Sequence, residues 1–223
     1  METATRKLTF LLAEPERRLL RWIAGRLPRS WMPDHLTALG VLGALLVGGG
    51  YALSPGHPGW LWLASLGLAI NWFGDSLDGT LARVRRIERP KYGYYIDHMV
   101  DAFNTAVIGA GIGLSPYVSL SLAMLVVILY LALSINIYLE SSVLGVFEIA
   151  YGIFGPTEVR LLLILANSAL FAGALWADLA AASVARIANG TLLVASGAML
   201  LVLTARFSRN LMRLARMEPA HRA

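Results

Sequence analysis

Cysteine is absent from this 223-residue chain, which excludes disulfide bonds, a thiolate nucleophile and a zinc–thiolate site. Charged residues are also scarce, at 15% of the chain against 57% for hydrophobic residues. A water-soluble domain spreads its charges over its helix faces, whereas here they cluster between long apolar runs. The composition therefore predicts an integral membrane protein in which any metal ion is held by oxygen or imidazole ligands.

The formal net charge of +5 has two explanations. Nucleic acid is the less favoured one, because no nucleic-acid recognition module is visible. The basic residues lie beside apolar segments, where anionic lipid headgroups or a phosphorylated substrate are suitable counter-charges. We expect membrane lipids among the partners and no nucleic acid. The oligomeric state stays open, with a homodimer as one arrangement.

Six stretches are long and apolar enough to cross a bilayer, since about 20 apolar residues span its hydrocarbon core. They are residues 35–53, 58–83, 94–113, 116–141, 157–177 and 181–206. Residues 1–30 instead interleave arginines with leucine and tryptophan at helical spacing, which is typical of an amphipathic interfacial helix. A solvated helix that packs on its own domain is the alternative. The expected fold class is an all-α integral membrane protein, with six transmembrane helices preceded by an N-terminal amphipathic interfacial helix.

Lys and Arg gather in the N-terminal segment, in the loop after the second span and in the tail, whereas the connections "SPGHPG" and "LSPY" have neither. Positive residues stay on the cytoplasmic side, so both termini and the loop after the second span are expected there. In a bacterium this would be the inner membrane. The expected division is an interfacial helix at 1–30, one six-helix domain at 31–210 and a basic cytoplasmic tail at 211–223. Since residues 1–30 have no continuous apolar core or cleavage site, we expect them in the mature protein.

Four aspartates interrupt the apolar pattern at the end of the second span and in the third. Asp75 and Asp78 fall on one helical stripe, and Asp97 and Asp101 on a matching stripe of the next helix. Taken as antiparallel neighbours, the two helices bring all four carboxylates into one cavity near the cytoplasmic side. Carboxylates this close repel one another, and without cysteine or suitably spaced histidine they favour oxygen-bound divalent ions, Mg²⁺ or Mn²⁺. Proton relays or simple pairing with basic residues are the alternatives.

The full spacing reads Asp75-x-x-Asp78-Gly79-x-x-Ala82-Arg83, nine residues, then Gly93-x-x-x-Asp97-x-x-x-Asp101. It resembles the signature of the CDP-alcohol phosphotransferase family, integral membrane enzymes of phospholipid synthesis. The resemblance covers the first three spans and, beyond them, the hydropathy profile. It implies six helices around a cytosol-facing cavity that holds two divalent ions and the cytidine nucleotide of a CDP-linked substrate.

The resemblance also implies roles for individual residues. Asp75, Asp78 and Asp97 would hold the first ion, and Asp75, Asp97 and Asp101 the second. Asp101 would also be the catalytic base that takes the proton of the acceptor hydroxyl. The "PDHLT" sequence matches a turn that opens the first span in this family. The expected CDP-binding positions are Asp34, His35, Leu36, Thr37, Gly79, Ala82, Arg83 and Gly93.

Two residues depart from the pattern and bear on the substrate. Pro90 stands where many relatives have Ser or Thr, and His98 after Asp97 resembles the choline and ethanolamine enzymes more than the phosphatidyl-transferring ones. Two reactions stay open: CDP-diacylglycerol donates a phosphatidyl group to a polar alcohol, or a CDP-amino alcohol donates its head group to a lipid hydroxyl. On the acceptor side we expect Asn136 and Glu140, which share a helix face, and Arg160.

A transporter that carries cations or protons on the aspartates is the alternative to an enzyme. It is less favoured, because the chain shows no internal repeat and the acids lie near one end of their helices. A catalytically silent scaffold would be expected to have lost at least one aspartate, and none is missing.

Overall fold

A computed structural model describes residues 12–144, 155–176 and 181–219 of the chain. These residues form seven α-helices and no strand: α1 (Ala13–Ala24), α2 (Pro33–Leu53), α3 (Trp60–Arg85), α4 (Pro90–Leu114), α5 (Leu120–Leu144), α6 (Pro156–Trp176) and α7 (Ala181–Met217). Each of the six apolar stretches is one helix, which confirms the all-α prediction. Residues 1–11 of the expected interfacial segment lie outside the described residues.

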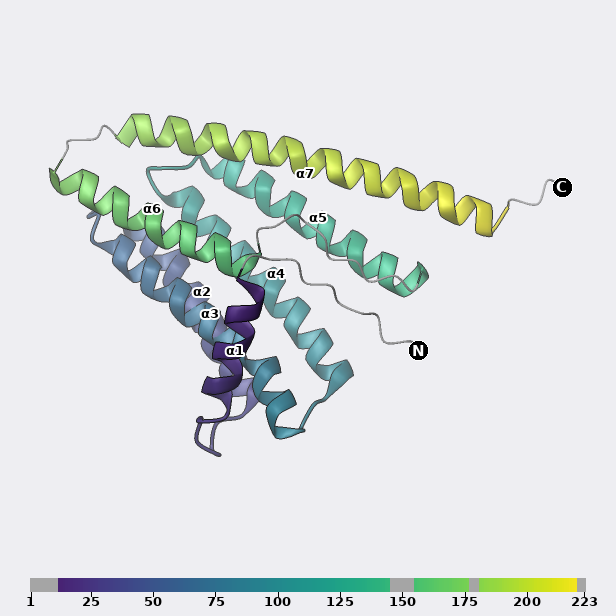
Figure 1. Ribbon diagram of the computed structural model, residues 1–223. Helices are drawn as coiled ribbons and strands as arrows, with labels where there is room; N and C mark the ends of the chain where they lie inside the picture. The colour runs from purple at the N-terminus through teal and green to yellow at the C-terminus, as the bar shows by residue number, and fades with distance from the viewer. Residues whose placement is uncertain (1–11, 145–154, 177–180, 220–223) are drawn as a thin grey trace.

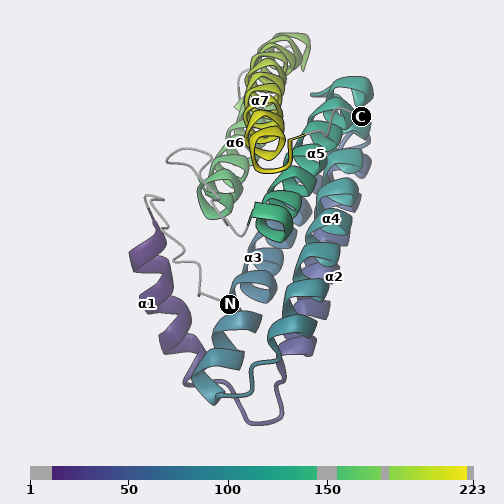
Figure 2. The ribbon, with the colours of Figure 1, turned by 90° about the vertical axis from the view of Figure 1, so that its right-hand side faces the viewer.

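The helices form a chain of packed neighbours with α2 near its centre. α2 packs on both α3 and α4; α4 then packs on α5, and α5 on α7. On the other side α6 packs on α3, and the short α1 crosses the end of α3 (Figures 1 and 2). The second and third spans were expected to be direct neighbours, whereas α3 and α4 both make extended contacts with α2.

Glycines allow α2 to pack this closely on its neighbours. A Cβ atom on Gly43 would lie 2.7 Å from the Asn71 Cα in α3, and one on Gly111 would lie 2.8 Å from the Gly48 carbonyl carbon. Real Cβ atoms do not approach so near, so a larger residue would push the helices apart. Small residues are what helix interfaces in a membrane use for close backbone approach.

Replacing one tight glycine and one open glycine of α2 tests this packing. We expect Gly43→Ala to lower the free energy of unfolding by about 1–3 kcal/mol, because the methyl group overpacks the α2–α3 contact. Gly49→Ala on the same helix meets no atom within 4 Å and should raise that free energy by up to about 1 kcal/mol through helix propensity. Reversible unfolding in mixed detergent micelles measures both. Equal effects of the two changes would contradict the close-packing account.

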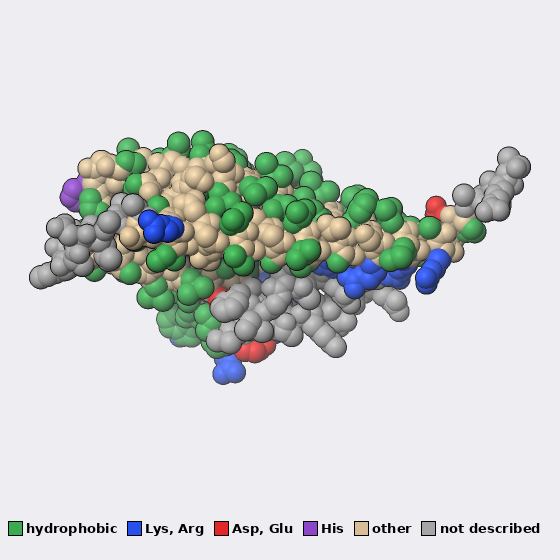
Figure 3. Space-filling view, turned by 90° about the horizontal axis from the view of Figure 1, so that it is seen from above, with side chains coloured by type: hydrophobic (Ala, Val, Ile, Leu, Met, Phe, Trp, Pro, Cys, Tyr) green, Lys and Arg blue, Asp and Glu red, His purple; other side chains and the backbone are tan. Residues whose placement is uncertain are grey.

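Within the part of the chain that the structure describes, three helices are long and apolar enough to cross a membrane: Pro33–Leu53, Leu120–Leu144 and Ser183–Met217. On α7, the side chains of Ile187, Val194 and Leu201 are 72%, 75% and 73% exposed and recur every seven residues. Figure 3 shows hydrophobic side chains along this helix and basic ones gathered along one edge towards its C-terminal end. An exposed apolar stripe of this length calls for lipid or a protein partner. The count of six spans stays a prediction.

The end of α7 differs from the expected span, because the helix continues beyond residue 206 to Met217. Its last turns are rich in Arg, Leu and Met, which favour helix, and Pro219 follows the helix end. The hydropathy of the sequence shows where the apolar stretch ends, but the helix continues past that point.

At the other end of the chain, α1 buries Leu20 and Ala24 against Leu36, Leu77 and Leu81. Its outward side chains include Leu19 and Trp22, so the described part of the amphipathic segment packs on the domain with one face.

Candidate metal centre

The structure gathers the aspartates of α3 and α4 at one place. Asp75, Asp97 and Asp101 each offer a carboxylate oxygen, and these oxygens lie within 4.8 Å of one another. Asp78 lines the same narrow cavity as Asp75 and Asp97, together with Thr37, Gly40, Val100 and Asn104. α3 and α4 both pack on α2, and Gly40 of α2 lines the cavity between their acidic stripes. The structure brings Asp75, Asp97 and Asp101 together as expected, and Asp78 lines the cavity beside them.

Polar neighbours hold two of the carboxylates in place. Thr37 donates its hydroxyl to Asp78 Oδ2 at 2.7 Å, and the Gly79 backbone N–H donates to Asp78 Oδ1 at 2.5 Å. Arg160 reaches from α6 and donates to Asp75 Oδ2 at 2.6 Å and to the Asn71 side-chain oxygen at 3.1 Å. The sequence suggested Arg160 as an acceptor-side residue but not this ion pair, because nothing local to α6 shows which acid it meets.

The donor set suits a hard divalent cation. Several carboxylates around one cavity repel one another, and the guanidinium of Arg160 compensates Asp75. Carboxylate oxygens are the ligands that Mg²⁺ and Mn²⁺ prefer, and three of them within 4.8 Å can close on one ion. The Asp97 side chain is 50% exposed, against 23% for Asp75, so Asp97 stands at the open side of the cluster. The residues therefore fit a divalent metal.

The predicted nucleotide-binding residues lie at the start of α2 and along the acidic faces of α3 and α4. Arg89 donates from one guanidinium nitrogen to both carboxylate oxygens of Asp34, at 2.6 and 2.7 Å. Hydrogen bonding to Asp34 raises the pKa of Arg89. The imidazole of His35 accepts from the Met32 backbone N–H, and Thr37 is committed to Asp78. Leu36 is fully buried in the α1–α3 core, which leaves its backbone as the part that could meet a ligand.

Glycines near the aspartates differ from those that pack helices. A Cβ atom on Gly93 would meet no atom within 4 Å, and one on Gly79 would meet only the flexible end of Arg83, at 3.4 Å. Helix packing therefore requires neither glycine, unlike Gly43. Ala82 is half-buried on the same helix as Gly79, and Arg83 is exposed with its guanidinium on Thr80. Open space beside Gly79 and Gly93 leaves room for a ligand against the backbone.

The remaining acceptor-side residues lie in a polar cluster between α5 and α7. Arg206 binds both oxygens of Glu140, at 2.8 and 3.2 Å, and Asn210 and Asn136 donate to Glu140 Oε1 at 2.5 and 3.0 Å. The structure thus brings Arg160 to the aspartates and places Asn136 and Glu140 at a helix contact. Arg206 is the last residue of the sixth apolar stretch, and its pairing with Glu140 was not predicted from the sequence.

His98 also has a packing role in the structure. Its ring lies 4.1 Å from the Tyr94 ring and 4.4 Å from the Tyr138 ring of α5, and Nδ1 is 2.7 Å from the Tyr94 carbonyl oxygen. A side chain held by two aromatic rings at the α4–α5 contact is weak support for a substrate role. The Asp97–His98 pair is therefore weak evidence for a choline-type enzyme.

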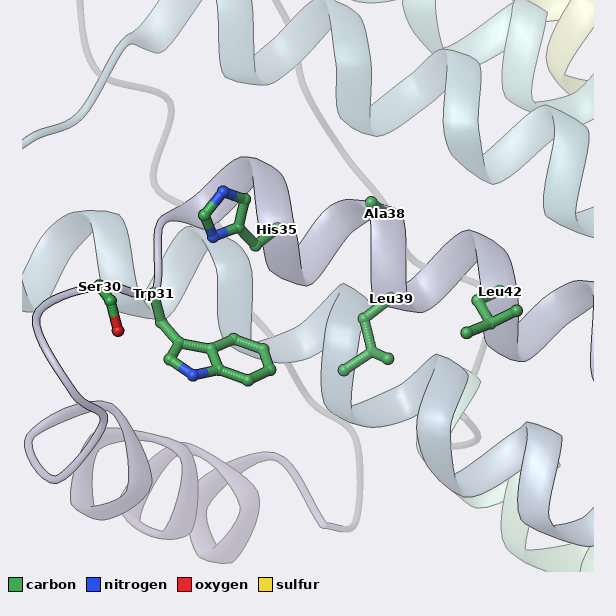
Figure 4. Close-up of a pocket in the computed structure, with 6 residues that line it drawn as sticks. All are labelled: Ser30, Trp31, His35, Ala38, Leu39 and Leu42. Atoms are coloured by element: carbon green, nitrogen blue, oxygen red, sulfur yellow. The ribbon is translucent and has the colours of Figure 1, made fainter.

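A second hollow lies away from the aspartates. This groove of about 490 Å³ runs along α2 and is lined by Ser30, Trp31, His35, Ala38, Leu39 and Leu42 (Figure 4). These α2 residues occupy the face opposite Thr37 and Gly40. The groove has no carboxylate in its lining, so the acidic cavity is the candidate site.

Comparison with known proteins decides the family. The family model described as CDP-alcohol phosphatidyltransferase matches residues 30–215, which is most of the chain and includes every aspartate of the cluster. The chain belongs to the CDP-alcohol phosphatidyltransferase family. The family match and the apolar helices together make it an integral membrane protein.

A curated relative in this family is the phosphatidylinositol phosphate synthase of Cutibacterium acnes. It is 35% identical to this chain over 82 residues, an alignment that covers 37% of the chain and 37% of the relative. The chain is therefore matched to a little over a third of that protein's length.

Proposed function

We propose that the chain transfers a substituted phosphate group from a CDP-linked alcohol to an acceptor hydroxyl, with release of CMP, in phospholipid synthesis. The observation that carries the proposal is the convergence of Asp75, Asp97 and Asp101, within 4.8 Å, in a chain that the family model matches over residues 30–215. A cation or proton transporter would use the same acids, but no feature of the described residues favours it over the enzyme.

The aspartates would bind two divalent ions, in the arrangement that the family signature implies. Asp75, Asp78 and Asp97 would hold one divalent ion, and Asp75, Asp97 and Asp101 a second. When bound, Mg²⁺ or Mn²⁺ supplies charge neutralisation for the diphosphate of the donor. Thr37 and Arg160 orient Asp78 and Asp75 through the bonds described above.

In the reaction, Asp101 takes the proton of the acceptor hydroxyl. The acceptor oxygen then bonds to the phosphorus that carries the donor alcohol, and the bond from that phosphorus to the CMP oxygen breaks. The nucleotide would lie over Gly79, Ala82, Arg83 and Gly93, with the start of α2 (residues 34–37) beside it. Open space at Gly79 and Gly93 supports this placement.

The membrane arrangement belongs to the same proposal. All six long helices span the bilayer, α1 lies in the interface, and the aspartates and both termini face the cytoplasm. A soluble nucleotide and a lipid would then meet at the cytoplasmic edge of the helices. Arg160, Asn136 and Glu140 are the acceptor-side candidates, of which Arg160 contacts the cluster.

Between the two donor arrangements, we favour CDP-diacylglycerol as donor and a polar alcohol as acceptor. The curated relative is named for a phosphatidyl product. His98, which suggested a CDP-amino alcohol, is engaged by Tyr94 and Tyr138. The acceptor itself, including any phosphate on it, is left to experiment.

The proposal is tested by CMP release from the full chain purified in detergent. A panel of CDP-diacylglycerol, CDP-choline and CDP-ethanolamine is combined with polar alcohols, their phosphates and diacylglycerol. We expect release with CDP-diacylglycerol, complete loss in EDTA because the carboxylates lose their cation, and recovery on adding Mg²⁺ or Mn²⁺. A chain that neither binds cytidine nucleotides nor releases CMP from any donor would be better explained as a transporter or scaffold.

A further inference from the structure

Asn104 is an interior polar residue at the inner end of the aspartate cavity. It lies one turn beyond Asp101 and two turns beyond Asp97 on α4, and so shares their face of the helix. Its side chain lines the cavity with Asp75, Asp78 and Asp97, and the residue is only 5% exposed. Its side-chain oxygen has no hydrogen-bond partner among the described residues.

Other interior asparagines of the chain are fully engaged at both ends of the amide. Asn71 donates to the Gly40 carbonyl at 2.9 Å and accepts from Arg160. Asn167 accepts from Tyr51 at 2.9 Å and donates to Ser65 at 3.1 Å. A buried carbonyl without a partner loses its hydration and gains nothing in return. Asn104 therefore differs from its counterparts in needing a partner that the protein does not supply.

The groups around the cavity narrow what that partner can be. Ionised carboxylates only accept hydrogen bonds, so Asp75, Asp78 and Asp97 cannot satisfy a carbonyl oxygen. The nearby donors serve other acceptors: the hydroxyl of Thr37 bonds to Asp78, and the guanidinium of Arg160 bonds to Asp75 and Asn71. A cation or a bound water molecule is therefore the partner that remains for the Asn104 carbonyl oxygen, and among carboxylates a hard cation is well suited to it.

We infer that the side-chain carbonyl of Asn104 is an additional oxygen donor of the divalent-metal site, facing the cation directly or through a water on it. This inference rests on the proposed function for the presence of the metal, and it adds a donor from outside the aspartate signature. Neutral amide oxygens are ordinary ligands of hard cations. Asn104 would bind without adding a fifth negative charge to a cavity that already holds several.

The alternative is that the amide is turned, so that its N–H₂ group donates to an aspartate and the residue is purely structural. Substitutions distinguish the two explanations, because each explanation predicts a different change in the stability of the metal-free protein and in its affinity for Mn²⁺. Asn104→Leu removes the unpartnered carbonyl, so under our inference the metal-free protein is as stable as wild type or more so, while Mn²⁺ binding weakens. Under the structural alternative, the metal-free Asn104→Leu protein is less stable and Mn²⁺ binding is unchanged.

The measurement is Mn²⁺ binding to the full chain in detergent, by electron paramagnetic resonance of free Mn²⁺, with thermal unfolding of the metal-free protein alongside. We expect Asn104→Leu to weaken Mn²⁺ binding by about 10- to 100-fold, the size typical of losing a supporting ligand interaction. Asn104→Asp supplies a carboxylate oxygen at the same place. It should retain Mn²⁺ binding and lower the melting temperature of the metal-free protein through repulsion.

Asn189→Leu is the matched control. Asn189 lies on α7 and forms hydrogen bonds with Ser119 and Ala185, neither of which lines the aspartate cavity. The substitution should lower the melting temperature and leave Mn²⁺ affinity unchanged. Wild-type affinity in Asn104→Leu would overturn the inference and leave the proposed function standing. A wild-type chain that binds no Mn²⁺ would overturn both, so the two failures are distinguishable.

Discussion

Asp101→Asn should lower the rate of CMP release by about 10²- to 10⁴-fold, the contribution usual for a positioned general base. Asparagine has almost the same shape as aspartate, but its amide cannot take up the proton of the acceptor hydroxyl. Asp101 lies within the carboxylate group that also includes Asp75 and Asp97, so the change removes one ligand charge as well. Initial rates are therefore measured at saturating Mg²⁺, with the Mn²⁺ affinity of the variant determined separately.

Glu88→Gln is the control for this experiment. It makes the same carboxylate-to-amide change at an exposed residue of the α3–α4 connection, and it should keep the wild-type rate. An Asp101→Asn protein that is folded, saturated with metal and still releases CMP at more than a tenth of the wild-type rate would remove Asp101 from the role of base. The aspartate cluster would then act through metal binding alone.

Much of the fold and of the acidic site could be predicted because the signals are local. Apolar stretches of about 20 residues mark helices, and acids three or four residues apart must share a helix face. Asp75 and Asp78 on one helix and Asp97 and Asp101 on the next therefore form stripes whatever else the chain does. The convergence of Asp75, Asp97 and Asp101 was predicted correctly. The contribution of α2 was not predicted: α3 and α4 each make extended contacts with α2, and Gly40 of α2 lines the acidic cavity.

The features that the sequence did not reveal all depend on contacts between distant segments. Arg160 begins α6 and could have paired with any acid at that side of the bundle; only the packing of α6 on α3 places it on Asp75. The unpartnered carbonyl of Asn104 is likewise visible only when its neighbours are placed. Similarly, Arg206 ends the sixth apolar stretch, and nothing local to it shows that it pairs with Glu140 of α5.

The Glu140–Arg206 pair is buried, with side chains 8% and 11% exposed. We expect its disruption to lower the free energy of unfolding strongly. Glu140→Ala would leave the guanidinium of Arg206 without this partner inside the α5–α7 contact, and would also remove the acceptor of Asn136 and Asn210. Removing one member of a buried ion pair costs about 3–5 kcal/mol. We expect a loss of that size in the free energy of unfolding, measured by reversible unfolding in mixed detergent micelles.

The double variant Glu140→Leu/Arg206→Leu separates the charge from the packing. If Glu140→Ala lowers the free energy of unfolding because it leaves the Arg206 charge buried without its partner, removing both charges should restore most of that free energy. Replacing a buried ion pair by hydrophobic residues often leaves stability unchanged or raises it. The exposed pair Glu14–Arg17, with side chains 60% and 46% accessible, is the matched control, and Glu14→Ala should cost no more than about 1 kcal/mol. A Glu140→Ala cost as small as that would mean that the ion pair does not hold α7 against α5. The apolar contacts of α5 and α7 would then have to do so, although α7 leaves most of its apolar surface exposed.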